Sequence, residues 1–454
     1  MRRATGLGVG LLSVLCIGVE PVAAQSIDLV RDTEIERVLH TYEDPILRVA
    51  GLDPHLIRIY LVNDPTLNAF AMHGPAASET TDIFVNTGLL LQLKTPNEVT
   101  GVLAHETGHI AGGDLTRDSG AVSKASVPML IGMAAGVAAM IAGAGDAGMA
   151  IMGVGEQAAQ SQFLAFSRTQ EATADQRGQK FLLATHQSGR GMLNVFERMA
   201  DEAAMSARYN APLISDHPAD RDRIDLMQRE VEASPYRDVP DSPEAVHEFH
   251  MLQAKLAGFL DPVDTVLNRY PTSDTSEEAR YARAVAYFRQ PDMQKAVEEI
   301  NTLVQEEPKN PYFWELLGQI YVEMSLPEKG VPPYQKSVDL LPDAPLLRVS
   351  LAAAQLATEK PQLATPALDN LKVALQQEND NTFAWFEAAQ AYSQLGNQPM
   401  ADLSTAERYY TVGAMKTAAH FATLAQRRLP KGSPDWQRAG DIMVVAGPDS
   451  NRHD

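Results

Sequence analysis

The sequence predicts an α+β protein, mostly helical, in which a mixed domain is followed by an α-solenoid. Two short segments with strand-like alternation, residues 57–62 and 82–86, lie in the first half of the chain. Residues 233–243 contain three prolines and are typical of a linker. Beyond them, small and aromatic residues recur with a period of 34, as in stacked helix pairs. We therefore expect one domain over residues 25–240 and a second over 241–454.

The first 24 residues are predicted to be a secretory signal peptide. Met1-Arg2-Arg3 gives a positive start, residues 4–19 are uncharged and mostly apolar, and small residues precede a cleavage site after Ala24. The apolar run is shorter than the ~20 residues that a membrane span needs. The one cysteine, Cys16, lies inside this segment, so the mature chain is expected to have no thiol and no disulfide. These features predict export to the periplasm, and a mature chain without cysteine must hold any metal ion through histidine and carboxylate side chains.

The chain is acidic, with a formal net charge of −20 at pH 7. This charge disfavours contact with nucleic acid, whose phosphates would be repelled. We therefore expect no nucleic-acid partner.

The elements of the mixed domain can be placed in order. Residues 57–62 alternate as a strand, residues 82–86 form a second strand, and Asn68-Ala-Phe-Ala71 lies between them. Thr95-Pro96-Asn97 predicts a helix start, because threonine caps free amides and proline suits the first turn. Glu98 adds a favourable charge to that turn.

The second domain is expected to consist of tetratricopeptide repeats. The stretch from Trp314 to Tyr321 matches the repeat pattern W-x2-L-G-x2-Y, and Pro342 takes the place of the closing proline. Equivalent positions begin one period earlier at Arg280 and one period later at Arg348, and a further copy at Trp385 is displaced by a few residues. A solenoid of such helix pairs offers a concave surface to an extended partner.

His105, Glu106 and His109 form an HExxH pattern in the helix that begins after Thr95. Residues four apart lie on one helix face, so both imidazoles can bind a single ion. Glu106 points to the side, where it can take a proton from a metal-bound water. Two histidines and a carboxylate suit zinc best, and we expect one zinc ion per chain.

The third ligand is predicted on a helix that includes Glu171 and Asp175. These carboxylates are four residues apart and therefore share a face. One can bind the zinc ion while the other accepts a hydrogen bond from a ligand imidazole. A solvated helix face would show the same spacing, and the upstream HExxH pattern favours the metal site. His217, which precedes Pro218, is either a further site residue or a turn residue.

Together these segments resemble the HtpX and CAAX-prenyl-protease family of metallopeptidases, and within it the exported branch with a tetratricopeptide domain. The resemblance covers nearly the whole mature chain and implies a zincin-type peptidase domain before the solenoid. Its motifs recur in order at Asn68–Ala71, Asn86–Leu89, Glu98–His109, Ser167–Asp175 and His217–Ile224.

The resemblance implies a role for each residue of the metal site. His105, His109 and Glu171 would bind zinc, and Glu106 would be the general base. Asp175 would hold a ligand histidine in one tautomer.

Two further roles are implied by the resemblance. His217 would approach the zinc, either to aid the oxyanion or to keep the enzyme latent. An extended substrate would pair with an edge strand formed by Asn68, Ala69, Phe70 and Ala71. Met72-His-Gly-Pro75 replaces the glycine-rich turn that often follows in the family, which leaves the shape of this strand open.

Residues 125–145 are uncharged and long enough to span a membrane. They are rich in alanine, glycine and methionine, and Pro128 lies near their start. We favour packed helices beside the active site; a hairpin or plug in peripheral contact with the membrane, and a true span, stay open.

The sequence as a whole predicts a periplasmic zinc metalloendopeptidase. From the resemblance, its substrates would be unfolded or stalled envelope and outer-membrane proteins, and it would also act as a chaperone. The solenoid would dock substrates or the outer-membrane assembly machinery. The alternative is an assembly adaptor in which the solenoid does the work and the metal site is latent or vestigial.

Overall fold

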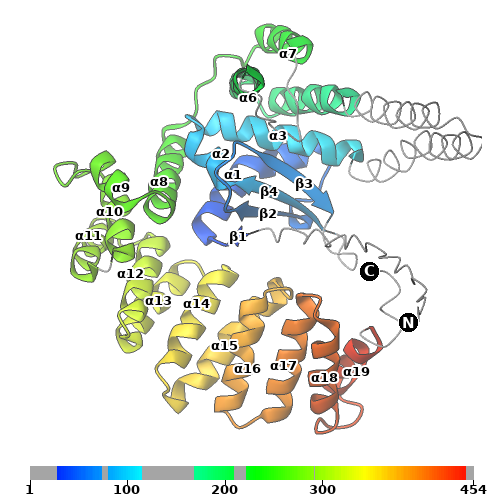
Figure 1. Ribbon diagram of the computed structural model, residues 1–454, viewed down its shortest axis with the longest axis vertical. Helices are drawn as coiled ribbons and strands as arrows, with labels where there is room; N and C mark the ends of the chain where they lie inside the picture. The colour runs from blue at the N-terminus through cyan, green and yellow to red at the C-terminus, as the bar shows by residue number, and fades with distance from the viewer. Residues whose placement is uncertain (1–27, 74–79, 115–167, 209–220, 291, 446–454) are drawn as a thin grey trace, which may run out of the picture.

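The computed structural model describes residues 28–73, 80–114, 168–208, 221–290 and 292–445. The predicted signal peptide, the apolar segment 125–145 and His217 lie outside these ranges. Within them, a small sheet covered by helices is followed by a curved stack of helices (Figure 1). The fold is α+β and mostly helical, which confirms the predicted class.

Four strands form one sheet in the order β1-β2-β4-β3. Their bounds are Leu29–Val30 for β1, Ile57–Val62 for β2, Ala69–His73 for β3 and Thr81–Asn86 for β4. The central pair β2 and β4 is parallel, and the two outer pairs are antiparallel. The predicted strand 57–62 coincides with β2, and the predicted strand 82–86 begins one residue late in β4. The segment after Asn68 is β3, at one edge of the sheet.

One face of the sheet forms the core with the helices α1 (Thr33–Ala50) and α3 (Pro96–Gly112). In β2, Ile57, Ile59 and Leu61 are at most 5% exposed, whereas the residues between them are partly exposed. Burial of each such side chain contributes about 1.5–3 kcal/mol. This face therefore fixes how α3 lies on the sheet.

Helix α3 begins where the sequence predicts. The Thr95 side chain accepts a hydrogen bond from the backbone N–H of Glu98, and the Glu98 carboxylate accepts one from the N–H of Lys94. The helix ends at Gly112 and is capped by Gly113, whose φ of 67° suits glycine. Most of its residues are buried on all sides, so α3 is a central helix held by sheet and helices alike.

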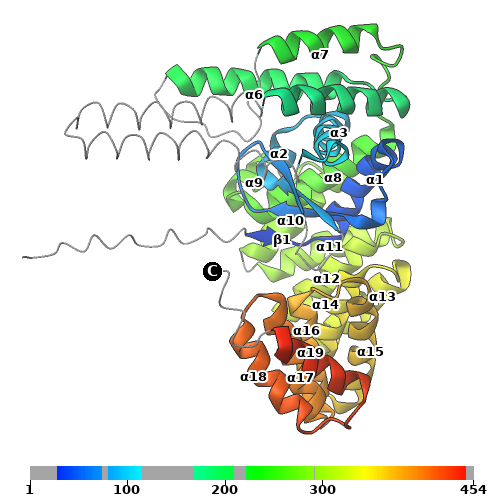
Figure 2. The ribbon, with the colours of Figure 1, turned by 90° about the vertical axis from the view of Figure 1, so that its right-hand side faces the viewer.

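Further helices surround this core. They are the short η1 (Pro54–Leu56) and α2 (Thr87–Gln92), a helix over residues 168–184, α6 (Arg190–Arg208) and α7 (Arg221–Ala233). Figure 2 shows α6 and α7 at the end of the molecule opposite the solenoid. Among the described residues, no helix is both long and apolar enough to cross a membrane.

The solenoid consists of paired helices that follow α8 (Pro243–Leu260) and the short α9 (Val263–Arg269). The pairs are α10 (Glu277–Arg289) with α11 (Met293–Glu306), α12 (Pro311–Glu323) with α13 (Pro327–Leu340), α14 (Pro345–Ala357) with α15 (Pro361–Gln377), α16 (Thr382–Gln394) with α17 (Gln398–Thr411), and α18 (Met415–Gln426) with α19 (Pro434–Val445).

The predicted repeat period is visible in the helix starts. Helices α10, α12 and α14 begin at residues 277, 311 and 345, whereas α16 begins at 382. The later copy is displaced because α15 has 17 residues, compared with 14 in α11 and in α13. Trp314, Arg348 and Trp385 each donate to the carbonyl six residues earlier, at 2.9, 2.8 and 2.8 Å. Equivalent repeat positions therefore make equivalent contacts.

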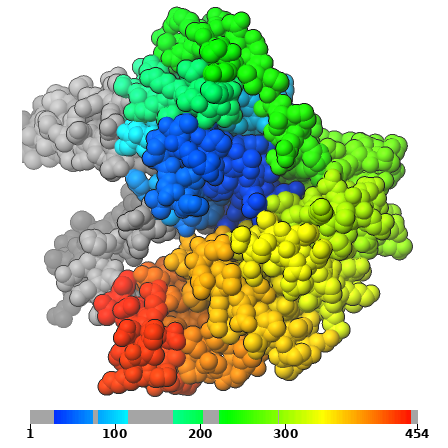
Figure 3. Space-filling model, turned by 180° about the vertical axis from the view of Figure 1, so that it is seen from behind, coloured from blue at the N-terminus to red at the C-terminus, as the bar shows by residue number. Residues whose placement is uncertain are grey.

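Helix α8 belongs to both parts of the molecule. Phe249 and Leu252 are buried in the core under the sheet, while Met251 is buried among the first solenoid helices. Lys255, also buried, pairs with Asp32 at 2.6 Å and with Glu34 at 3.0 Å. The two parts consequently lie in direct contact, as the space-filling view shows (Figure 3).

A second contact joins the sheet to the middle of the solenoid. The loop between α15 and α16 carries Glu378 and Asp380, which pair with Arg31 and Arg58 beside β1 and on β2. The solenoid therefore curves back toward the face of the sheet that α1 and α3 leave uncovered (Figure 1).

Candidate metal centre

Two histidines and one glutamate lie close together in the core of the domain that contains the sheet. His105 and His109 lie one turn apart on α3, and Glu171 lies on the helix over residues 168–184. Their ligand atoms all lie within 4.8 Å of one another, and the three side chains are buried. The structure thus brings together the three residues that the sequence predicts as metal ligands.

The spacing of these atoms fits a tetrahedral zinc site. The two histidine Nε2 atoms are 3.1 Å apart, and the Glu171 carboxylate oxygens lie 3.4 Å from Nε2 of His109 and 3.6 Å from Nε2 of His105. Ligands bound to zinc at about 2.0–2.1 Å with tetrahedral angles would be about 3.3–3.4 Å apart. The donor set and its geometry therefore suit zinc.

Each of the two histidines has a carboxylate next to its Nδ1 atom, on the ring side away from the predicted metal position. Nδ1 of His105 lies 3.0 Å from Asp175, and Nδ1 of His109 lies 3.2 Å from Asp114. A carboxylate on Nδ1 fixes the ring and leaves the Nε2 lone pair directed at the ligand position. Burial lowers the pKa of His109, but its hydrogen bonds to Asp114 and Glu171 outweigh burial and raise it to about 10. The cluster is therefore built to hold positive charge between its carboxylates.

Arg223 on α7 ties the two carboxylates of the neighbouring helix together. Its Nε and a terminal nitrogen hold Asp175 at 2.7 and 2.9 Å, and its other terminal nitrogen lies 3.0 Å from Glu171. Burial alone would raise the pKa of Asp175, but the hydrogen bonds with His105 and Arg223 hold it below its ordinary range. Asp175 therefore stays ionised while it orients His105.

Glu106 is buried beside the two predicted ligand histidines. A second buried glutamate, Glu43 of α1, lies close enough for the charge of Glu106 to affect it. The hydroxyl of Thr107 donates to one Glu43 oxygen at 3.0 Å, and the other oxygen has no hydrogen-bond partner among the described residues. Burial, reinforced by the charge of Glu106, raises the pKa of Glu43 to about 8, although the hydrogen bond from Thr107 opposes the shift. Glu43 is thus a neutral acid at neutral pH.

Substitution of Glu43 by glutamine is expected to flatten the dependence of stability on pH. The folded protein holds the Glu43 proton up to about pH 8, whereas the unfolded chain releases it near pH 4.5. This contribution is therefore present below about pH 4.5 and lost as pH rises through 8, on the order of 3–5 kcal/mol in all. Urea denaturation from pH 4.5 to 8.5 measures it. Glu298→Gln, at an exposed position of α11, is the control, and identical curves for Glu43→Gln and wild type would contradict the assignment.

Close backbone packing places Glu171 next to α3. A Cβ atom on Gly108 would lie 2.5 Å from the carbonyl oxygen of Ala174, and one on Gly178 would lie 3.1 Å from that of Ala104. Small residues at these crossing points let the two helices approach closely. Since Gly108 lies between the two ligand histidines, this crossing sets the distance from Glu171 to both.

Gly108→Ala is therefore expected to separate the helices, to destabilise the protein by about 1–3 kcal/mol and to weaken zinc binding. Denaturation and zinc titration of the same preparation test both effects. Gly440→Ala on α19 is a matched control, because its Cβ would meet only the end of the flexible Gln426 side chain. Unchanged stability and zinc affinity for Gly108→Ala would show that the crossing does not position Glu171.

The remaining predicted residues are placed as follows. Ala69, Phe70 and Ala71 lie in β3, which packs against α3, and Asn68 directly precedes the strand. His217 is outside the described residues. Its role stays a prediction.

Three residues at the site were not assigned a role from the sequence: Asp114, Arg223 and Glu43. Asp114 follows His109 closely, and its proximity could have been read from the same stretch of sequence. Arg223 lies in the segment His217–Ile224, which carries the resemblance but gave this residue no role. Glu43 comes from a distant segment and carries no local pattern, so the fold alone brings it to the site.

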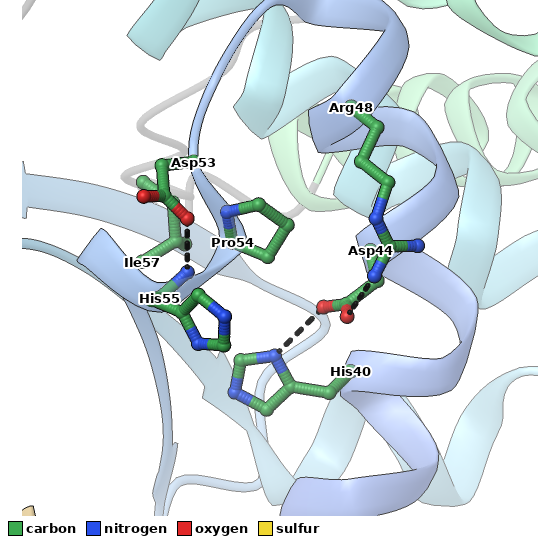
Figure 4. Close-up of a pocket in the computed structure, with 7 residues that line it drawn as sticks. All are labelled: His40, Asp44, Arg48, Asp53, Pro54, His55 and Ile57. Carbon is green, nitrogen blue, oxygen red and sulfur yellow. Dashed lines mark hydrogen bonds and ion pairs between the residues drawn. The ribbon is translucent and has the colours of Figure 1, made fainter.

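A separate surface cavity of about 480 Å³ is lined by His40, Asp44, Arg48, Asp53, Pro54, His55 and Ile57 (Figure 4). Asp44 pairs with both His40, at 3.2 Å, and Arg48, at 3.0 Å. None of these residues is on α3 or is a predicted ligand. The cavity is therefore distinct from the candidate metal centre.

Comparison with known proteins agrees with this geometry. The family described as "Peptidase family M48" matches residues 31–231. The chain is 21% identical to the beta-barrel assembly-enhancing protease of Yersinia pestis over 416 residues, 91% of this chain and 83% of that protein. It is 30% identical to a protease HtpX homolog of Syntrophobacter fumaroxidans over 200 residues, covering 37% of this chain and 67% of that one. It is 32% identical to the metalloprotease LoiP of Escherichia coli over 181 residues, covering 39% of this chain and 62% of that protein.

Proposed function

The chain belongs to peptidase family M48, and from this membership we propose that it is a zinc-dependent metalloendopeptidase with one zinc ion per chain. The observation that carries the proposal is the buried triangle of His105, His109 and Glu171, whose edges of 3.1, 3.4 and 3.6 Å suit tetrahedral zinc. These three residues would hold the ion.

The residues around the ion have separate tasks in hydrolysis. Zinc, when bound, polarises the peptide carbonyl and makes a water molecule more acidic. Glu106 accepts the proton of the attacking water and delivers it to the leaving amine. Asp175 and Asp114 keep the ligand imidazoles in one tautomer, and His217 would aid the oxyanion or hold the enzyme latent.

We further propose that the substrates are unfolded or stalled envelope and outer-membrane proteins in the periplasm. The name of the Yersinia relative, a beta-barrel assembly-enhancing protease, and the predicted signal peptide support this location and substrate class. The solenoid over residues 241–454 would dock substrates or the outer-membrane assembly machinery and contribute a chaperone role. Residues 125–145, part of the peptidase domain over residues 25–240, would pack as helices beside the active site; the alternative is peripheral contact with the membrane.

The test uses the mature protein purified without added metal or chelator. Elemental analysis is expected to find about one zinc per chain, and the protein is expected to cleave an unfolded outer-membrane protein until the zinc is chelated. His217→Ala is assayed in parallel, because it would release a latent site. A folded protein without zinc, inactive in both forms, would contradict the proposal and favour the adaptor, whose work depends on the solenoid alone.

A further inference from the structure

A row of aromatic rings crosses the outer face of the sheet, which is the face away from α1 and α3. Tyr60 of β2 lies directly opposite Phe84 of β4, and Phe84 lies directly opposite Phe70 of β3. The ring centroids are 5.7 Å apart in the first pair and 5.0 Å in the second, and both pairs are stacked. Aromatic neighbours on adjacent strands stabilise their pairing.

The row ends at Phe70, because β3 is an edge strand. Among the described residues, β3 pairs with β4 and with no other strand. Phe84, in the middle of the row, is only 8% exposed, whereas Phe70 is partly exposed. One side of the last ring is therefore left for a further neighbour.

The backbone at the same edge is oriented to bind another strand. The N–H of Asn86 donates to the carbonyl of Asn68 at 3.1 Å, which makes these two residues a hydrogen-bonded pair. In an antiparallel ladder such pairs alternate, so Phe70 turns its N–H and C=O toward β4. Ala69 and Ala71 then turn theirs toward the open edge.

The side chains along β3 divide between the two faces. Those of Ala69 and Ala71 lie on the core side, where β3 packs against α3, the helix that carries Glu106. Phe70, between them, projects to the outer face with the aromatic row. An added strand would hence meet small side chains on the side of the metal centre and a single aromatic ring on the other.

We propose that Phe70 selects substrates: an extended polypeptide adds to the open edge of β3, and its residue opposite Phe70 is aromatic. This inference rests on the proposed function and names the substrate class for that site. If the strand adds antiparallel, the residue opposite Phe70 forms a non-hydrogen-bonded pair, in which facing side chains are closest, about 4.5 Å between Cα atoms. The substrate ring continues the row from Tyr60 through Phe84 and Phe70. Segments of β-forming sequence that carry aromatic residues at alternate positions fit this surface best.

Binding is measured with the zinc-loaded Glu106→Gln variant, in which cleavage is expected to be too slow to consume the peptide during the measurement. Labelled peptides of extended sequence carry phenylalanine at one position, moved along the peptide, against an all-alanine background. We expect one register to bind about three- to ten-fold more tightly than the alanine peptide. Adding Phe70→Ala removes that preference, and Phe70→Leu, which keeps an apolar side chain in the strand, reduces it. The Phe383→Ala control, at an exposed aromatic residue of α16, retains it.

Two outcomes would overturn the inference: no register prefers phenylalanine, or the preference survives Phe70→Ala in protein that melts as the parent does. If Phe70→Ala fails to fold, the Phe70→Leu variant decides by the same comparison. The zinc content and cleavage by the wild-type protein are read separately. Cleavage without an aromatic preference contradicts this inference alone, whereas a zinc-free, inactive wild-type protein contradicts the proposed function.

Discussion

Glu106→Gln is expected to retain one zinc per chain and to hydrolyse peptide bonds about 10³-fold more slowly than the wild-type protein. Glutamine has nearly the same shape as glutamate, so the buried surroundings of residue 106, which is 1% exposed, are kept. Glutamine cannot accept a proton from water at neutral pH, and the step that generates the nucleophile is lost. The three predicted metal ligands, His105, His109 and Glu171, are unchanged.

Two measurements on one preparation check this result: zinc content by elemental analysis and cleavage of an unfolded protein. Glu98→Gln is a matched control, because Glu98 is another buried glutamate of α3, paired with Arg198 and not with the metal centre. We expect that control to keep its activity. A Glu106→Gln variant as active as the wild type would exclude Glu106 as the base.

Arg223→Ala is expected to lower the free energy of unfolding by about 3–5 kcal/mol, because it leaves two buried carboxylates without their cation. Arg223 is 5% exposed and contacts both Asp175 and Glu171. Zinc affinity is expected to fall about 10- to 100-fold, since Asp175 would no longer be held against His105. Arg223→Lys keeps the positive charge but not the two parallel hydrogen bonds. Its stability and zinc affinity are therefore expected to lie between those of the wild type and of Arg223→Ala.

The dependence of stability on acidic pH distinguishes the charge interaction of Arg223 with Asp175 from a contribution of Arg223 to packing alone. The pKa of Asp175 is lowered in the folded protein, so its contribution to stability is present above its ordinary value of 3.8 and is lost at more acidic pH. Without Arg223 this loss begins at less acidic pH. Denaturation between pH 3 and 7 measures the shift. Arg190→Ala, which breaks an exposed pair with Asp238, is the control and is expected to leave the curve in place. An unchanged acid limb for Arg223→Ala would contradict the role given to Asp175.

The sequence predicts those parts of the fold that depend on local patterns. Strand β2 follows from strict alternation, α3 from the cap at Thr95 and the proline after it, and the solenoid from its period. The two-residue strand β1 is too short to produce a pattern, and its pairing with β2 depends on the finished sheet. Likewise, nothing local marks α8 as a helix shared by two cores.

The candidate metal centre shows the same limit. Residues that share a helix turn, such as His105 and His109, can be paired from their spacing. Glu171 could be matched to them only through its own pair with Asp175 and the resemblance. Arg223 and Glu43 lie on other helices, and their approach depends on long-range packing that no spacing encodes. Gly108 looks like any helical glycine until the crossing with Ala174 is known.

Helix α8 makes the joint between the two parts of the molecule stiff. When two domains are joined by a flexible linker, each can move independently of the other. Here the same helix supplies Phe249 to one core and Met251 to the next, and the buried Lys255 is paired with Asp32, just before α1. A force on the solenoid is consequently passed through α8 to the helices that pack against the sheet. A polypeptide bound to the repeats would therefore be held in a fixed position relative to the sheet and α3.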